Sequence, residues 1–173
     1  LTMIVLPLLF CAWAWSMEYL RRFRPGLNRA LMKVFGKMAH PHEYHRVNSA
    51  TWYATALLIL ALTSPPVVCS LAVVVLAFGD TTAAWIGRRF GRHRFASGRS
   101  IEGTLAFVGA ATLVSLLVLG IYHPRFSLVA SLLLALGAAV PAAFVELVSE
   151  SIDDNFIIPL AAAAGANLVL LLL

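Results

Sequence analysis

The chain has 173 residues, of which 61% are hydrophobic and only 12% are charged, with a formal net charge of +5. Soluble domains average about 25% charged residues, so this composition excludes an ordinary soluble domain and indicates a membrane protein. Membrane topology accounts for the basic balance, and no nucleic-acid motif accompanies it, so no nucleic-acid partner is expected.

Six apolar runs along the chain predict six transmembrane helices, because a helix needs about 20 residues to cross a bilayer. The runs span residues 1–19, 48–63, 66–87, 104–123, 126–148 and 156–173. The first run carries no small-residue cleavage site, so we expect it to be retained. Cys11 and Cys69 lack CxxC spacing and are expected to be free packing residues. The prediction is an all-α, polytopic membrane protein with a single domain over 1–173.

The charges give this topology an orientation. Six helices place the loops 20–47, 88–103 and 149–155 on one side of the membrane, and of the 13 Lys and Arg residues only Arg125 lies on the other side. The positive-inside rule makes the first side cytoplasmic. All 8 acidic residues share that side, which the rule does not require, so the acids indicate function at the cytoplasmic face.

The basic segment 20–47 is predicted to be an interfacial amphipathic helix that binds anionic headgroups. Its apolar positions share one helical face: Leu27, Leu31, Val34, Phe35 and Met38. The alternative role is a lid or entrance for a lipid substrate. The three histidines within "HPHEYHR" lack the i, i+4 spacing of a helical metal pair, so no zinc site is predicted there.

Asp80 ends a long apolar run, at or near the cytoplasmic end of the third predicted helix. An ionisable group in that position is expensive to bury and is therefore a functional candidate. The alternative is a structural ion pair with Arg88 or Arg99.

Small residues recur every fourth position around Asp80, at Gly79, Ala83, Gly87 and Gly91. Such a stripe is typical of close helix packing. Here it continues into the arginine-rich "GRHRFASGRS", where glycines permit close backbone approach and guanidinium groups match phosphate oxygens. The arginines carry more positive charge than topology needs, and a nucleoside triphosphate would use it.

Two further acidic segments follow. Ser100-Ile101-Glu102-Gly103 opens the fourth helix with ordinary helix-start chemistry. In "VELVSESIDDNFIIP", Glu146, Glu150 and Asp154 are four residues apart and would share one face if the helix continued. A divalent cation would relieve their mutual repulsion, and magnesium held by one or two carboxylates plus substrate phosphates is the usual phosphoryl-transfer arrangement.

These motifs carry a family resemblance. The run "GDTTAAWIGRRFGRHRFASGRSIEG" resembles the G-D-x-x-A-x-x-x-G-x-x-x-G-x(n)-K-S-x-E-G signature of CTP-dependent lipid kinases, the family of dolichol, phytol and yeast-type diacylglycerol kinases. "VELVSESIDDNFIIP" resembles that family's E-x(n)-D-N-x-x-x-P element, and "RVNSATWYATALLIL" resembles the segment before its second helix. The resemblance covers most of the chain from Arg46 to Pro159.

The resemblance implies an integral membrane kinase that uses magnesium to transfer the γ-phosphoryl group of CTP to the hydroxyl of a membrane lipid. The acceptor would be a polyprenol, a phytol-like prenol or diacylglycerol. The site would face the cytoplasm, in the cell membrane of a prokaryote or the endoplasmic reticulum of a eukaryote.

The resemblance and the residue patterns together assign candidate roles. The expected catalytic residues are Asp80, Glu102 and Asp154. The expected nucleotide-binding residues are Gly79, Gly87, Arg88, Gly91, Arg92, Arg99, Ser100, Gly103 and Asn155. The expected metal ligands are Asp80, Glu146 and Asp154, and the choice of the general base stays open. Arg99 stands where the family motif has lysine, which keeps the charge but changes the shape.

The sequence leaves two alternative functions. A CTP-dependent cytidylyltransferase acting on phosphatidate would carry a Lys-Asp followed by His-Gly-Gly, whereas this chain has "SIDDNFIIP". A small transporter or lipid-binding protein would place its ionisable groups near the bilayer midplane, whereas the acids here gather at one face.

Overall fold

The computed structural model of the protein describes residues 2–24, 26, 47–95 and 97–173. Within these ranges the regular structure is helical and no strand forms. The elements are α1 (Thr2–Phe23), α3 (Ser49–Thr63), α4 (Pro66–Val74), the π-helix η2 (Val75–Asp80), α5 (Thr81–Phe90), α6 (Ile101–Tyr122), α7 (Leu128–Val148) and α8 (Asp154–Leu172). The predicted all-α class is confirmed.

Five of the predicted membrane helices are long and apolar enough to cross a bilayer. They are Met3–Phe23, Pro66–Phe90, Ile101–Tyr122, Leu128–Val148 and Asp154–Leu172. The remaining one, α3, is apolar but has only 15 residues. The protein is therefore an integral membrane protein, and its described residues contain five full-length spans and one shorter helix where about six helices were predicted.

The chain divides into two compact units, residues 1–62 and 63–173; a single domain over 1–173 stays a prediction. In the first unit, α1 and α3 pack through a small buried cluster of Cys11, Ala14 and Ala54. Beside it the indole of Trp15 donates a hydrogen bond to Thr55 Oγ1 over 3.0 Å. Both cysteines are free thiols, as predicted.

Helix α1 ends at Phe23, four residues beyond the predicted end at residue 19. The extension is stabilised by Glu18, whose buried carboxylate pairs with Arg21 Nε at 2.7 Å and Arg22 Nε at 3.0 Å, one turn further along the helix. Most of the predicted interfacial segment 20–47, including its three histidines, lies outside the described residues.

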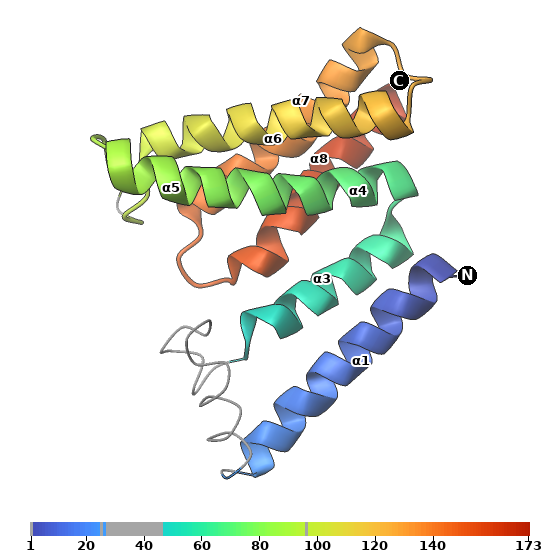
Figure 1. Cartoon of the computed structure of the whole chain (residues 1–173), viewed down its shortest axis with the longest axis vertical. Helices are drawn as coiled ribbons and strands as arrows, with labels where there is room; N and C mark the ends of the chain where they lie inside the picture. Colours follow the sequence, from blue (N-terminus) through green and yellow to red (C-terminus); the bar gives the residue numbers. More distant parts are fainter. Residues whose placement is uncertain (1, 25, 27–46, 96) are drawn as a thin grey trace. The chain divides into compact units, whose positions relative to one another are not determined.

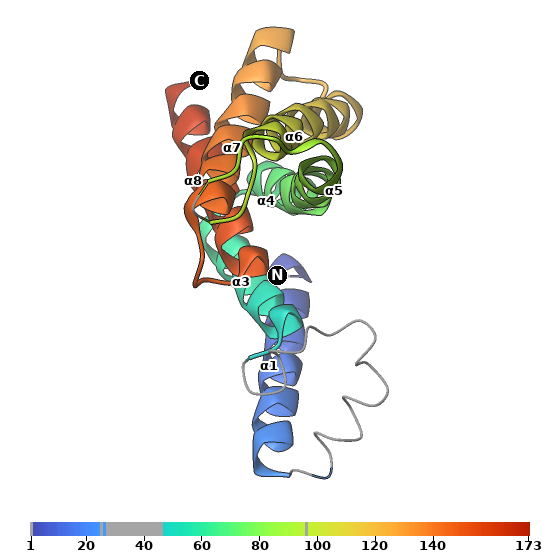
Figure 2. The ribbon, with the colours of Figure 1, turned by 90° about the vertical axis from the view of Figure 1, so that its left-hand side faces the viewer.

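The second unit is built from two helix pairs that cross. Figures 1 and 2 show α4, η2 and α5 running on as one rod with α6 beside it, while α7 and α8 cross this pair. Helices α7 and α8 approach closely at two glycines: a Cβ on Gly137 would lie 2.5 Å from Val169 Cγ2, and a Cβ on Gly165 would meet the Gly137 carbonyl. Small residues permit such approach in membrane helices.

The π-helix η2 lies directly before the functional segment. It ends at Asp80, and its buried Gly79 faces α6, where an added Cβ would lie 2.7 Å from the ring of Phe107. At Gly79, the stripe of small residues therefore allows α6 to pack closely against the rod. Asp80 was expected at or near the end of the third predicted helix. It lies well inside the rod instead, because the ten residues of α5 follow it and the helix continues to Phe90.

Candidate active site

A cavity of about 340 Å³ lies in the second unit, where the rod, the loop after it and the ends of α6, α7 and α8 meet. Its lining residues are Asp80, Ala83, Ala84, Gly87, Arg88, Arg94, Gly98, Arg99, Ser100, Gly103, Thr104, Glu146 and Asp154. The structure thereby brings together eight of the residues expected from the sequence: Asp80, Gly87, Arg88, Arg99, Ser100, Gly103, Glu146 and Asp154.

The loop between α5 and α6 folds back on itself as a short hairpin. The amide of Phe95 donates to Arg99 O over 2.8 Å, and the amide of Ile101 donates to His93 O over 3.0 Å. Gly98 turns the chain with a φ of 80°, a conformation that favours glycine. The hairpin therefore presents the side chain of Arg99 to the cavity from a defined backbone.

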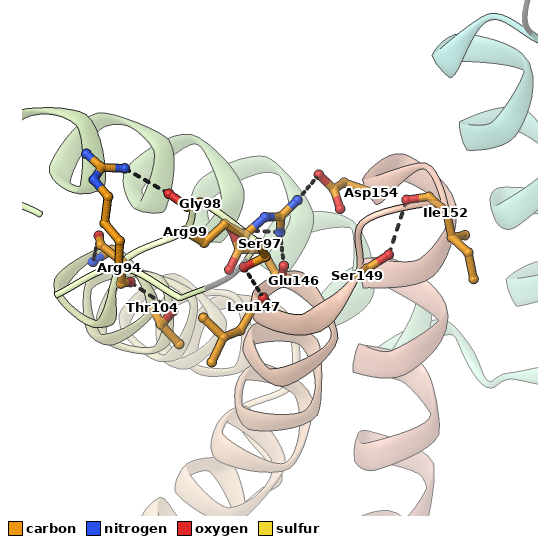
Figure 3. Close-up of polar contacts among 12 residues, drawn as sticks. Arg94, Ser97, Gly98, Arg99, Thr104, Glu146, Leu147, Ser149, Ile152 and Asp154 are labelled. Atoms are coloured by element: carbon orange, nitrogen blue, oxygen red, sulfur yellow. Dashed lines mark hydrogen bonds and ion pairs between the residues drawn. The ribbon is translucent and has the colours of Figure 1, made fainter.

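Arg99 joins this hairpin to two helix ends. Its Nη1 lies 2.8 Å from Glu146 Oε1, and its Nη2 lies 2.6 Å from Asp154 Oδ2. Nη1 also donates to the backbone carbonyl of Glu146. Next to it the hydroxyl of Ser97 donates to Leu147 O over 2.8 Å, so both bonds engage carbonyls in the last turn of α7 (Figure 3). Such carbonyls lack partners inside the helix.

Each of the two carboxylates keeps one oxygen unused. Glu146 Oε2 and Asp154 Oδ1 are buried and have no hydrogen-bond partner among the described residues. The Glu146 side chain is only 8% exposed. Burying a carboxylate oxygen without a partner costs free energy. Such oxygens are suitable ligands for a hard divalent cation.

Asp80 completes the acidic lining. Within the described parts of the chain its carboxylate makes no hydrogen bond and no ion pair, unlike Glu146 and Asp154. Those parts contain no group of three or more His, Cys, Asp or Glu residues arranged to hold a metal alone. The donor set thus fits a cation that takes two carboxylates and draws its other ligands from a substrate.

Glu102 lies outside the cavity lining. Its carboxylate accepts the backbone amide of Arg92 at 3.1 Å and contacts the His93 ring at 2.9 Å between Oε1 and Nδ1. Glu102 thereby fastens the start of the hairpin to the first turn of α6. Its expected catalytic role stays a prediction, and its contacts indicate an indirect one.

Ser100 begins α6 as its N-cap: the hydroxyl oxygen accepts the amide of Gly103 over 3.1 Å. The side chain is buried against α5, because a Cβ on Gly87 would lie 3.0 Å from Ser100 Oγ. Gly87 and Gly103 therefore serve both the helix contact and the cavity wall.

The remaining expected residues lie elsewhere. Gly79 and Gly91 pack against side chains, of Phe107 and Ser100 respectively. The cavity lining includes neither Arg92 nor Asn155, although the Asn155 amide donates to Asp153 Oδ1 over 3.0 Å at the start of α8.

The expected single helical face of Glu146, Glu150 and Asp154 does not form. Helix α7 ends at Val148, and α8 begins anew with Asp153 as its N-cap. Glu150 is exposed in the loop between them. Glu146 and Asp154 are brought together from two helices by Arg99.

One contributor, Arg94, was expected only as part of the basic run and was given no site of its own, and another, Ser97, was missed from the sequence. Arg94 lines the cavity, and its guanidinium donates to Gly98 O over 2.8 Å and to Gly87 O over 3.2 Å. Its place in the basic run could have suggested it. The Ser97 contact with Leu147 spans 50 residues and had no local signal.

Known proteins give three informative matches. The chain is 37% identical over 101 residues to a phytol kinase of Synechocystis sp., covering 57% of this chain and 42% of that protein. It is 24% identical over 172 residues to CTP-dependent diacylglycerol kinase 1 of Saccharomyces cerevisiae, covering 89% and 59%. It is 26% identical over 165 residues to the enzyme of that name in Eremothecium gossypii, covering 85% and 52%.

The chain spans about half the length of these curated relatives. No family model matches the chain, and no solved structure matches it. The named relatives confirm the resemblance read from the motifs: in sequence this chain is similar to a phytol kinase and to CTP-dependent diacylglycerol kinases.

Proposed function

We propose that the protein is a CTP-dependent lipid kinase, which transfers the γ-phosphoryl group of CTP to the hydroxyl of a membrane lipid alcohol. One observation carries the proposal: Asp80, Glu146 and Asp154 line the same cavity as three arginines, among helices long enough to cross a membrane. Phosphoryl transfer requires mainly positioning and charge stabilisation, which such a set of side chains supplies.

The metal of this reaction would be magnesium, held by Glu146 and Asp154 through the oxygens that Arg99 leaves unused. When bound, it would supply positive charge that offsets the charge developing on the transferred phosphate. Arg99 holds the two carboxylates beside each other despite their like charge. The protein supplies two ligands, and the nucleotide phosphates supply others.

Other residues of the cavity lining suit the nucleotide phosphates. Gly87 and Gly103 carry no side chain that would keep a phosphate away from the backbone. Arg88 and Arg94 add positive charge to the lining.

Asp80 is the acid that we assign to the acceptor hydroxyl. Its carboxylate is not engaged by Arg99, so it can accept the hydroxyl proton as the lipid oxygen bonds to the γ-phosphorus and the bond to the β-phosphate oxygen breaks. The products are a lipid monophosphate and CDP. The relatives are named for phytol and for diacylglycerol, so we propose a lipid alcohol of the prenol or diacylglycerol type as acceptor. Following the distribution of charge, we place this site at the cytoplasmic face.

The test is label transfer from CTP to an organic-extractable product, with purified protein, magnesium and separate polyprenol, phytol, diacylglycerol and phosphatidate acceptors. Parallel reactions carry the label in the γ- or the α-phosphate. We expect label from the γ-position alone, in the product of one alcohol. Label from the α-position would mean cytidylyl transfer and would overturn the proposal, as would no label with any acceptor.

A further inference from the structure

The arginines of the cavity differ in what they already bind. Arg99 makes three contacts with protein acceptors: the carboxylates of Glu146 and Asp154 and the backbone carbonyl of Glu146. Its side chain is 24% exposed. Both of its terminal nitrogens are thus engaged inside the protein.

Arg94 is engaged in a similar way. One of its terminal nitrogens donates to Gly98 O and the other to Gly87 O, at 2.8 and 3.2 Å. These bonds hold the hairpin against the end of α5. Arg94 adds positive charge to the cavity lining, but both of its terminal nitrogens donate to backbone carbonyls.

Arg88 has no such contacts. It is exposed, lines the cavity, and makes no hydrogen bond or ion pair with the described residues. Its neighbour Arg89 differs again, since its guanidinium lies 5.6 Å from the centre of the Phe90 ring and it does not line the cavity. Arg88 is therefore the cavity arginine whose donors are available to an anion.

From these contacts we propose a division of labour, which rests on the function proposed above. Arg99 is a positioning residue that holds Glu146 and Asp154 so that each keeps one oxygen for the metal, and Arg88 is the residue that binds the nucleotide phosphates. A lysine in place of Arg99 could not do the same, because an ammonium group is a point charge without the planar fork that spans two carboxylates. In this chain the planar guanidinium of Arg99 contacts Glu146 through one terminal nitrogen and Asp154 through the other.

The experiment compares four variants of the full chain in detergent: Arg99→Gln, Arg99→Lys, Arg88→Gln and, as the matched control, Arg89→Gln. Binding of Mn²⁺ without nucleotide is measured by electron paramagnetic resonance. Binding of CTP is measured at low and at saturating Mg²⁺. Thermal unfolding verifies that each variant is folded. The CTP-binding result for Arg88→Gln can be interpreted even if an Arg99 variant does not fold, because Arg88 is exposed and makes no hydrogen bond or ion pair with the described residues.

We expect both Arg99 variants to weaken Mn²⁺ binding, because Glu146 and Asp154 then lose the contact that holds them side by side. Arg99→Lys is the decisive variant, because it keeps the positive charge and removes only the planar fork, whereas Arg99→Gln also removes a charge that repels the cation. The CTP affinity of both variants should recover at saturating Mg²⁺. Arg88→Gln should leave Mn²⁺ binding unchanged and weaken CTP binding by about tenfold at every Mg²⁺ concentration. Arg89→Gln should match the parent chain in both assays.

Two results would overturn this assignment. One is a folded Arg99→Lys variant that binds Mn²⁺ as tightly as the parent chain or more tightly; the other is an Arg88→Gln variant that binds CTP as well as Arg89→Gln does. Binding is measured without acceptor or turnover, so its outcome is separate from that of label transfer. If label transfer fails while the binding pattern holds, the proposed reaction is wrong and the assignment of the arginines stands.

Discussion

Arg99 and Asp154 are 55 residues apart in the chain, yet their side chains form an ion pair of 2.6 Å. The same guanidinium binds Glu146, so one side chain ties the hairpin to the end of α7 and the beginning of α8. The cavity depends on this three-way junction, because neither acid is placed by a neighbour in its own helix.

Replacing Asp80 or Asp154 by asparagine should lower the rate of phosphoryl transfer by about a hundredfold or more, the usual loss when a preorganised charged group at a reacting phosphate is removed. Both substitutions keep the side-chain volume. The measurement is label transfer from γ-labelled CTP at saturating substrate.

Glu150→Gln is the matched control for these acids, because Glu150 is exposed and lies in the α7–α8 loop outside the cavity. It should keep the parent rate. An Asp80→Asn variant with full activity would remove Asp80 from the reaction.

Glu102→Ala should loosen the hairpin, because the Arg92 amide and the His93 ring would lose their carboxylate acceptor. Trypsin should then cleave after Arg92 or Arg94 faster than in the parent chain, which limited proteolysis with mass spectrometry measures. CTP affinity should fall while Mn²⁺ binding is kept. Glu102→Gln, which retains an acceptor oxygen, should restore part of the protection; unchanged cleavage in Glu102→Ala would contradict a positioning role.

Ser100 and Ser127 are both N-caps, of α6 and α7, and each hydroxyl accepts an amide three residues later. Replacing either by alanine should cost roughly 0.5–2 kcal/mol of stability. Only Ser100→Ala should also lower transfer activity, because Ser127 lies outside the cavity lining. Unfolding in detergent and label transfer separate the two effects, and equal activity losses in both variants would contradict the placement of Ser100.

Gly79→Ala should destabilise the second unit by roughly 1–3 kcal/mol, the usual cost of overpacking. The new Cβ would lie 2.7 Å from two atoms of the Phe107 ring, which is fully buried. Gly109→Ala, on α6 with no atom within 4 Å of its Cβ, should be neutral or slightly stabilising. Thermal unfolding of the two variants tests this, and adding Phe107→Leu to Gly79→Ala should recover stability if the ring is the obstacle.

Helix positions were predictable because apolar runs are long and their breaks contain proline or charges. The predicted 126–148 and the observed Leu128–Val148 differ by two residues at one end. The ends predicted for the first and third helices were wrong for a physical reason. Glu18 pairs with two arginines and continues α1 to Phe23, and the arginines of α5 lie on an exposed helical end that hydropathy alone does not detect.

The acids of the cavity were identified from composition and motif, but their geometry was not. A period of four residues suggested one helical face for Glu146, Glu150 and Asp154, whereas the α7–α8 turn places only the first and last in the cavity. The deciding contacts, from Arg99 and Ser97, each cross about 50 residues of sequence. Helical periodicity reports neighbours within a turn and is silent about such distant pairs.

The rod from Pro66 to Phe90 has 25 residues, so at about 1.5 Å per residue it is about 37 Å long, against a hydrocarbon core of about 30 Å. If Pro66 stands at one boundary of that core, Asp80 would lie about 9 Å below the opposite boundary. The reacting groups would then meet beneath the headgroups, in a water-filled depression of the membrane surface. The lipid hydroxyl would then react close to its normal depth in the leaflet, and the nucleotide phosphates would have to enter below the headgroup level.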